Sequence, residues 1–192
     1  MKHIADRFVV VLDANVLFPF RKRDVLLRFC QAGLFRARWS GDILDEWTRN
    51  LLAQKPHLAE SIQSQLKAMQ EAFPEALVTG YEPLIEALVL PDPDDRHVLA
   101  AAIRCGAQHI VTENLADFPD RALEAFSIRA IDADEFLSRT FDLYPAEALA
   151  TLHTVREGYR NPPFTPSEFV MDLMAKGLPK LGSRLGPLRA FL

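Results

Sequence analysis

Short apolar runs alternate with segments of helical spacing over the first 140 residues. The run Phe8–Leu12 (FVVVL) consists of β-branched and aromatic residues, which predicts a strand buried on both faces, as in a parallel sheet. Further strands are predicted at 36–39, 76–79, 109–112 and 127–131. Helices are predicted between them at 24–34, 41–53, 56–73, 83–89 and 94–105. This alternation predicts an α/β fold with a central, mainly parallel sheet.

The pattern changes in the last quarter of the chain. A helix that is capped by Asp132 or Asp134 and runs to about Phe141 ends the alternating part. Two or three helices follow, at about 145–158, 165–176 and 183–190, and proline- and glycine-rich joints separate them. We therefore expect an α/β domain over 1–140 and a small helical extension over 141–192.

Composition adds few constraints. The chain is 49% hydrophobic and 25% charged, the balance of an ordinary globular protein. Its net charge of −4 argues weakly against a general nucleic-acid coat protein but allows a local basic patch. Such patches are found at Arg21–Arg38, with six basic residues and a single acid, and from Lys176 onward, with four basic residues and no acid.

The sequence predicts a cytoplasmic protein with no membrane segment. Cys30 and Cys105 lie in predicted helices among apolar neighbours, as reduced core thiols do. No apolar stretch approaches the ~20 residues that span a bilayer. The first residues, MKHIADRF, contain no apolar core of a secretion signal.

Asp13 and Glu46 are two acids whose positions allow a role in a site. Asp13 ends the first strand and is followed by Asn15; in open α/β sheets, ligands bind at the carboxyl ends of strands. Turn formation is an equally good explanation for both residues. Glu46 borders the apolar face of its helix, whereas Asp42 and Asp45 fall on the opposite side. A surface glutamate is the alternative there.

Asp95 is the strongest candidate. It lies on the same helical face as Val98 and Leu99, where a carboxylate needs a cation or several donors. An N-cap is the alternative, but Asp94 can take that role. Asn114 and Asp117 follow the strand at 109–112, so they share the sheet edge of Asp13, or else serve a turn.

Taken together, these residues form an all-oxygen set. Carboxylates and amides suit a hard cation such as Mg²⁺ or Mn²⁺. A zinc site would need His or Cys at ligand spacing, and the five histidines show none.

Four motifs in this order resemble the PIN domain, a superfamily that includes the toxins of VapBC-type pairs. They are VVLDANVL (10–17), IL-x-EW (43–47), D-x-x-V-L-A-A-A (95–102) and IVTENLADF (110–118). The resemblance covers about residues 6–140 and implies an α/β/α sandwich. The sequences of the third and fourth motifs are most similar to those of a branch that carries an extra helical C-terminal region. The helices predicted after Phe141 agree with that.

The resemblance also implies a function. It implies a metal-dependent ribonuclease in which Asp13, Glu46, Asp95 and Asn114 form the catalytic set and hold one or two Mg²⁺ or Mn²⁺ ions. Asp117 matches a further acid near the same edge, and Asp92 and Asp94 lie close enough to take part. Asn114 stands where the family often has Asp, which removes one charge.

Substrate and partner contacts complete the expectations. Asn15, Arg21, Lys22 and Arg23 follow the first acid and are the predicted substrate-binding residues, with an ordinary solvated charge run as the alternative for the basic three. The apolar tail residues suit packing on the main domain, a homodimer contact or an antitoxin helix. They are Leu178, Leu181, Leu185, Leu188, Phe191 and Leu192.

Two other functions remain open. One is a PIN-like module that binds RNA or protein and has lost catalysis. The other is a phosphohydrolase of the haloacid dehalogenase type, since D-x-N after the first strand is similar to its D-x-D. That family needs a second Asp where this chain has Asn15, and a later lysine that the sequence does not supply.

Overall fold

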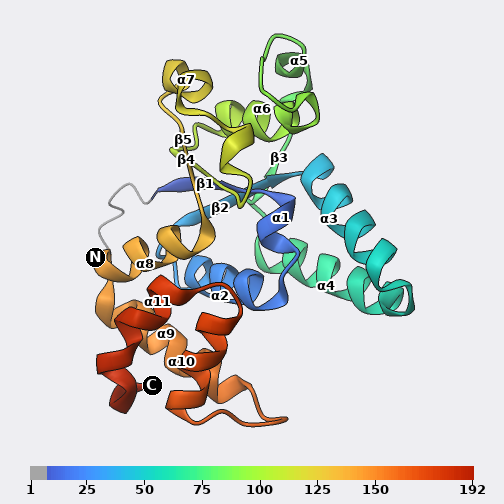
Figure 1. Cartoon of the computed structure of the whole chain (residues 1–192). Coiled ribbons are helices and arrows are strands. Elements are labelled where there is room, and N and C mark those ends of the chain that lie inside the picture. The colour runs from blue at the N-terminus through green and yellow to red at the C-terminus, as the bar shows by residue number, and fades with distance from the viewer. Residues whose placement is uncertain (1–7) are drawn as a thin grey trace. The chain divides into compact units, whose positions relative to one another are not determined.

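A computed structural model describes residues 8–192 and shows a five-stranded parallel sheet (Figure 1). The strands are β1 (Val9–Leu12), β2 (Arg36–Ser40), β3 (Leu77–Val78), β4 (His109–Val111) and β5 (Arg129–Ile131). All five predicted strands are present, so the predicted α/β fold with a parallel sheet is confirmed. The expectation about a secretion signal concerns residues 1–7, which lie outside the described residues.

The strand order places β1 at the centre. The order is β3-β2-β1-β4-β5, and Val10 pairs with Ala37 on one side and His109 on the other. Val10, Val11 and Leu12 are fully buried, as their unbroken apolar run predicts. The chain first builds outward from β1 to β3 and then returns to add β4 and β5 on the opposite side. The carboxyl ends of β1 and β4 therefore form the switch point where ligands bind in open α/β sheets.

Two compact units make up the described chain. The first unit contains residues 8–18 and 35–131 and the second contains 19–34 and 132–192. Besides the sheet, the first unit has these helices and short 3-10 turns: α1 (Ala14–Leu17), α3 (Gly41–Gln54), η1 (Pro56–Leu58), α4 (Ala59–Ala72), α5 (Glu82–Ile85), η2 (Pro93–Asp95), α6 (Arg96–Cys105), η3 (Leu115–Asp117), α7 (Asp120–Leu123) and η4 (Glu124–Phe126).

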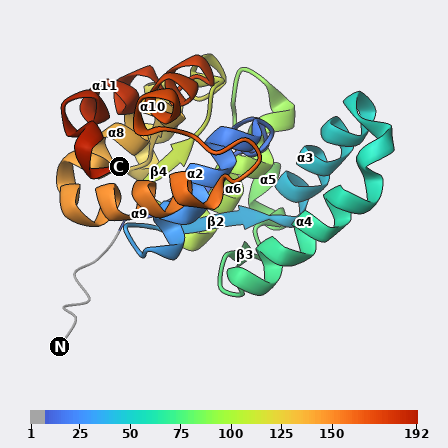
Figure 2. The same ribbon diagram turned by 90° about the horizontal axis from the view of Figure 1, so that it is seen from below.

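Helix α6 provides most of the cover for one face of the sheet. It contacts β1, β2 and β4 through a continuous apolar face, and its residues from Val98 to Ala102 are buried (Figure 1). Gly106 ends α6 with a φ of 65°, a left-handed conformation that glycine adopts without strain. At the β2–β3 side of the sheet, α3 and α4 pack on each other (Figure 2). Ser40 caps α3, and its hydroxyl accepts a hydrogen bond from the Ile43 amide at 3.2 Å.

The second unit is helical. It contains α2 (Phe20–Gln31), α8 (Ala133–Leu143), α9 (Pro145–Gly158), α10 (Pro166–Ala175), α11 (Pro179–Leu185) and η5 (Gly186–Phe191). Asp132, one of the two predicted caps, accepts a hydrogen bond from the Glu135 amide at 2.8 Å. Leu178, Leu181 and Leu185 are fully buried, and α11 packs on α8 and α10. Most of the apolar tail thus packs inside its own unit.

The division of the chain differs from the expected one. The predicted boundary at residue 140 falls inside α8, and the second unit also includes α2 from early in the sequence. The reason is that Val25, Leu26 and Phe29 give α2 an apolar face, and α2 packs on α8 and α9. A periodic pattern shows that such a face exists but not which element covers it.

Three helix positions also differ from the prediction. Helix α2 begins at Phe20 rather than near residue 24, α5 ends at Ile85 rather than near residue 89, and α11 spans Pro179–Leu185 rather than 183–190. Proline at the first helical position explains the earlier start of α11, since its fixed φ suits that position. None of the helices formed by residues 8–192 is long and apolar enough to cross a membrane.

Candidate active site

The candidate site lies at the switch point of the sheet, in the first unit. Asp13 follows β1 directly and Thr112 follows β4, and the Asp13 amide donates to the Val111 carbonyl at 3.1 Å. This bond extends the pairing of the two strands by one residue. The side chains that emerge at the ends of β1 and β4 are therefore neighbours.

Asp13 is held by a fixed set of donors although it is only 2% exposed. One carboxylate oxygen accepts from the Ala14 amide at 2.6 Å; the other accepts from the Asn15 side-chain amide at 2.6 Å and from the Thr112 hydroxyl at 2.7 Å. Burial raises the pKa of Asp13, and the Thr112 and Ala14 bonds oppose that rise. Asp13 is also the N-cap of α1, as the turn interpretation predicts.

Asn15 has a structural task at this position. Its side-chain nitrogen donates to Asp13 and, at 3.0 Å, to the Thr112 hydroxyl, and its side-chain oxygen accepts from the Glu113 amide at 3.0 Å. Both ends of the amide are thus engaged. Asn15 therefore positions Asp13; its predicted contact with substrate stays a prediction.

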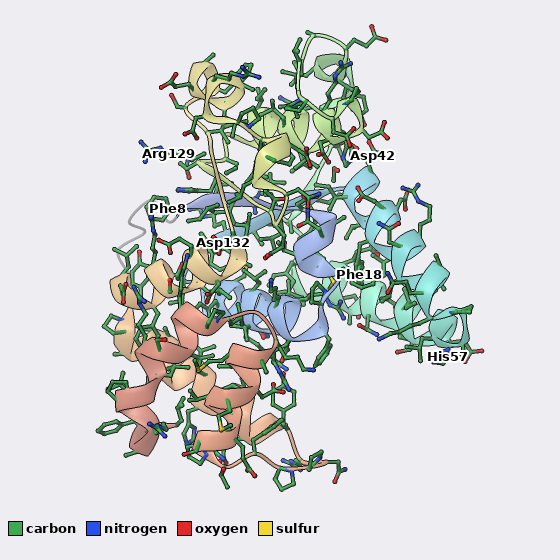
Figure 3. The ribbon with its side chains drawn as sticks, viewed as in Figure 1. Phe8, Phe18, Asp42, His57, Arg129 and Asp132 are labelled. Carbon is green, nitrogen blue, oxygen red and sulfur yellow. The ribbon has the colours of Figure 1, made fainter. Side chains whose placement is uncertain are left out.

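Glu46 faces the site from α3, as its place on the helix predicts. It is partly buried, whereas Asp42, in the first turn of the helix (Figure 3), and Asp45 are exposed. Its carboxylate lies 3.6 Å from Nε2 of His97 on α6. The other ring nitrogen of His97 is buried and has no hydrogen-bond partner within the described chain.

Asp95 ends the turn η2, immediately before α6. Asp95 occupies the N-cap position of α6, the alternative to the inward-facing role, but its side chain makes no capping bond. Asp94, the expected cap of the helix, does not take that position. Asp92 caps the turn η2 and accepts a hydrogen bond from the Asp94 amide at 2.9 Å. Burial raises the pKa of Asp95 to about 7, and the negative charges of the other acids add to that rise. These acids are Asp13, Asp117, Asp92 and Glu46.

Asn114 and Asp117 lie in the loop after β4. The Asn114 backbone amide donates to the Thr112 hydroxyl at 3.0 Å, and its side chain is exposed and makes no capping bond. Asp117, in η3, is close enough for its charge to raise the pKa of Asp95. The predicted residues of the loop therefore reach the same site as Asp13, Glu46 and Asp95.

Two clefts open at the site. The larger, which we call the acidic cleft, has a volume of about 670 Å³. It is lined by Asp42, Asp45, Glu46, Arg49, Asn50, Asp92, Asp94, Asp95, His97 and Asn114. The smaller, which we call the amide cleft, has a volume of about 340 Å³. It is lined by Ala14, Asn15, Phe18, Glu46, Asn50, Ala53 and Gln54, and it shares Glu46 and Asn50 with the acidic cleft.

The three cations of the predicted basic patch are not exposed. Arg21 Nε lies 2.6 Å from Asp172 Oδ2, and the guanidinium lies 4.1 Å from the centre of the Tyr159 ring. Lys22 and Arg23 are 9% and 5% exposed, and burial lowers the pKa of Arg23 to about 10. All three belong to the second unit. This arrangement contradicts an exposed phosphate-binding patch, because Arg21 is engaged by Asp172 and Tyr159 and the other two cations are buried.

Three residues of the site were not predicted from the sequence. Thr112 was identified only as a strand end, although a polar residue after a buried run, beside the strand of Asp13, is a usable signal. Arg49 is three residues after Glu46 and so lies on the same side of α3. It is exposed, and no ion pair holds it within residues 8–192. His97 gives no distinctive sequence signal.

The donor chemistry of this site fits a divalent cation. In the part of the chain that the structure describes, no three His, Cys, Asp or Glu side chains are already arranged as a metal centre. The site fits a divalent cation by its negative charge and by the type of its donor atoms. The carboxylate and amide oxygens around Asp95 are the ligands that Mg²⁺ and Mn²⁺ prefer. A cation would offset the repulsion that raises the pKa of Asp95.

Comparison with known proteins agrees with this geometry. The family described as PIN domain matches residues 9–116, and the family described as VapC50 C-terminal domain matches residues 133–187. The second match begins within one residue of the second unit's main segment, which starts at residue 132. A relative from Mycobacterium tuberculosis, described as "Putative ribonuclease VapC50", is 36% identical over 129 residues.

That match covers 67% of this chain and 75% of the relative. No solved structure matches the chain significantly. The family match includes β1 to β4 and the residues Asp13, Glu46, Asp95 and Asn114 in one continuous range. The chain therefore belongs to the PIN-domain family, in the VapC-like branch that carries a VapC50-type C-terminal domain.

Proposed function

We propose that the chain is a divalent-metal-dependent endoribonuclease that hydrolyses phosphodiester bonds in RNA. One observation carries the proposal: Glu46, Asp95 and Asn114 line one cleft near Asp13, and burial together with the charges of the other carboxylates raises the pKa of Asp95 to about 7. Structural acids are normally paired with cations, whereas these acids face one another at a ligand-binding edge of the sheet. The relative described as a ribonuclease supports the substrate class.

Five residues are the proposed holders of Mg²⁺ or Mn²⁺: Asp13, Glu46, Asp95, Asn114 and Asp117. When bound, the metal supplies Lewis acidity that activates a water and stabilises charge on the leaving oxygen. The role of the chain itself is to orient these ligands. Asp13 is fixed by its three donors, whereas Glu46 and Asp95 line the acidic cleft, where a phosphodiester can reach them.

Arg49 is the proposed phosphate contact in place of Arg21, Lys22 and Arg23. It is the arginine that lines the acidic cleft, three residues after Glu46. A guanidinium binds phosphate oxygens through two parallel hydrogen bonds, and it would offset the repulsion between RNA and the acidic residues.

The activity is tested by incubating purified protein with a mixed RNA pool in Mg²⁺, in Mn²⁺ and in EDTA. We expect cleavage in at least one metal and none in EDTA. Binding of RNA without cleavage under every condition would favour the inactive module. Release of phosphate from a small phosphomonoester, with RNA left intact, would favour the haloacid dehalogenase-type phosphohydrolase.

We also propose that the protein is the toxin of a type II toxin–antitoxin pair, because its relative carries a VapC name. Expression of the chain alone is expected to arrest bacterial growth, and co-expression of the adjoining small gene should restore it. The matched control is Asp95→Asn, which should not arrest growth. Arrest by both proteins would separate the growth effect from catalysis and argue against the toxin assignment.

A further inference from the structure

The amide cleft differs in chemistry from the acidic cleft beside it. Helix α1 ends at Leu17 and contacts α3. Phe18 directly follows α1 (Figure 3), and it lines the cleft together with residues of α3. The walls contain one carboxylate, Glu46, and no basic residue. A phosphate would therefore be poorly held in this cleft, whereas a neutral group would not be repelled.

One face of α3 connects the two clefts. Glu46, Asn50 and Gln54 are spaced four residues apart, so they form a row along the helix. Glu46 and Asn50 line both clefts, and Gln54 lines only the amide cleft. A ligand bound at the acidic cleft can therefore continue along this row without leaving the surface.

The amide cleft presents an aromatic ring and two available amides. Phe18 is half-buried, and Asn50 and Gln54 are exposed. Within residues 8–192, no hydrogen bond holds either side-chain amide. Each amide offers a carbonyl acceptor and an NH₂ donor. A flat, neutral heterocycle with donors and acceptors on its edge matches this combination.

We propose that the amide cleft binds the base of the nucleotide next to the scissile phosphate. The base stacks on Phe18, and Asn50 and Gln54 read its edge. Recognition of this kind needs an unstacked, unpaired base, so the substrate class is single-stranded RNA or a loop rather than a duplex. This inference rests on the proposed ribonuclease function and adds a specificity site to it.

The test uses a randomised single-stranded RNA pool, with the cut positions read by sequencing. Wild type is expected to prefer one base at a single position beside the cut. Phe18→Ala should reduce kcat/KM roughly tenfold and flatten that preference, because stacking on an aromatic ring stabilises a bound base. Phe18→Trp should retain the preference, and Gln54→Ala should change which base is preferred.

A binding measurement gives a second readout that does not depend on cleavage. RNA with 2-aminopurine at the preferred position is titrated in EDTA, and its fluorescence should fall when the base stacks in wild type but not in Phe18→Leu. The leucine variant keeps the apolar bulk, so it serves if Phe18→Ala folds poorly. Arg49→Gln is the matched control. It should weaken the binding of all sequences alike and reduce the slope of log binding constant against log salt concentration by about one.

The outcomes separate the inference from the proposed function. If wild type cleaves RNA and Phe18→Leu keeps both the base preference and the fluorescence change, the amide cleft is not a base site. If Arg49→Gln alters the base preference as much as Phe18→Leu does, the base is recognised in the acidic cleft instead. Absence of cleavage by wild type contradicts the ribonuclease, and a duplex bound as tightly as a single strand contradicts the substrate class.

Discussion

Asp95→Asn is expected to lower the rate of RNA cleavage by at least about a thousandfold, since it removes a charge on which metal binding and phosphate chemistry depend. The same change should stabilise the metal-free protein above pH 7. Asp95 has its pKa raised to about 7 by burial and by the charges of neighbouring acids, so its ionised form is unfavourable in the fold. Loss of activity together with gain of stability distinguishes a functional carboxylate from a structural one.

The direction in which stability changes with pH follows from the raised pKa of Asp95. The folded protein holds the Asp95 proton up to a pH of about 7, whereas the unfolded chain releases it near its ordinary value of 3.8. The stabilising contribution of Asp95 is therefore lost as the pH rises from about 4 to about 7. Because the side chain is partly exposed, we expect this loss to be on the order of 1–2 kcal/mol.

Thermal unfolding in EDTA at pH 5 and pH 8 measures this effect. The melting temperature of wild type should fall between these two values by more than that of Asp95→Asn. Asp94→Asn is the matched control, because Asp94 lies in the same turn but is exposed. Equal losses of cleavage in both variants would assign the effect to the charge of the turn rather than to Asp95.

The sequence sufficed for the parts of this fold that depend on local pattern. The FVVVL run becomes the central strand, and Glu46 faces inward while Asp42 and Asp45 do not, because helix periodicity fixes the direction of each side chain. Parallel strands also bring their carboxyl ends to one edge. That geometry is why Asp13 and Asn114, 101 positions apart in the sequence, could be expected in the same site.

Features set by tertiary partners could not be predicted in this way. The basic run at Arg21 has the composition of a phosphate-binding patch, but Asp172 and Tyr159, from the far end of the chain, take up Arg21. The unit boundary was missed for the same reason, because α2 is covered by helices more than a hundred residues later. Local periodicity contains no information about such pairings.

The acids of the site divide into a buried group and an accessible group. Asp13 is buried and bound by three donors, so its position is fixed before any ligand arrives. Glu46 and Asp95 line an open cleft and have fewer constraints. Preorganisation of one ligand lowers the cost of ordering the others, so the activity should depend on the residues that hold Asp13.

Thr112→Val is therefore expected to have the second largest effect, although it nearly preserves side-chain shape. The Thr112 hydroxyl is fully buried; it donates to Asp13 at 2.7 Å and accepts from Asn15 and from the Asn114 amide at 3.0 Å each. Removing it leaves buried polar groups unpaired, which should lower the free energy of unfolding by about 1–3 kcal/mol. Cleavage should fall roughly 10–100-fold, as for other residues that support metal ligands.

The pH profile shows whether Thr112 acts through Asp13. The Thr112 bond lowers the pKa of Asp13 against the effect of burial, so the valine variant should have a higher Asp13 pKa. Since Asp13 must be ionised to hold a cation, the acidic limb of the rate profile should move to higher pH, and more metal should be needed for half-maximal rate. Thr112→Ser keeps the hydroxyl and should restore both. A valine variant that is less stable but has the wild-type profile and metal requirement would limit Thr112 to folding, and Asp13 would then be oriented by Asn15 and the Ala14 amide alone.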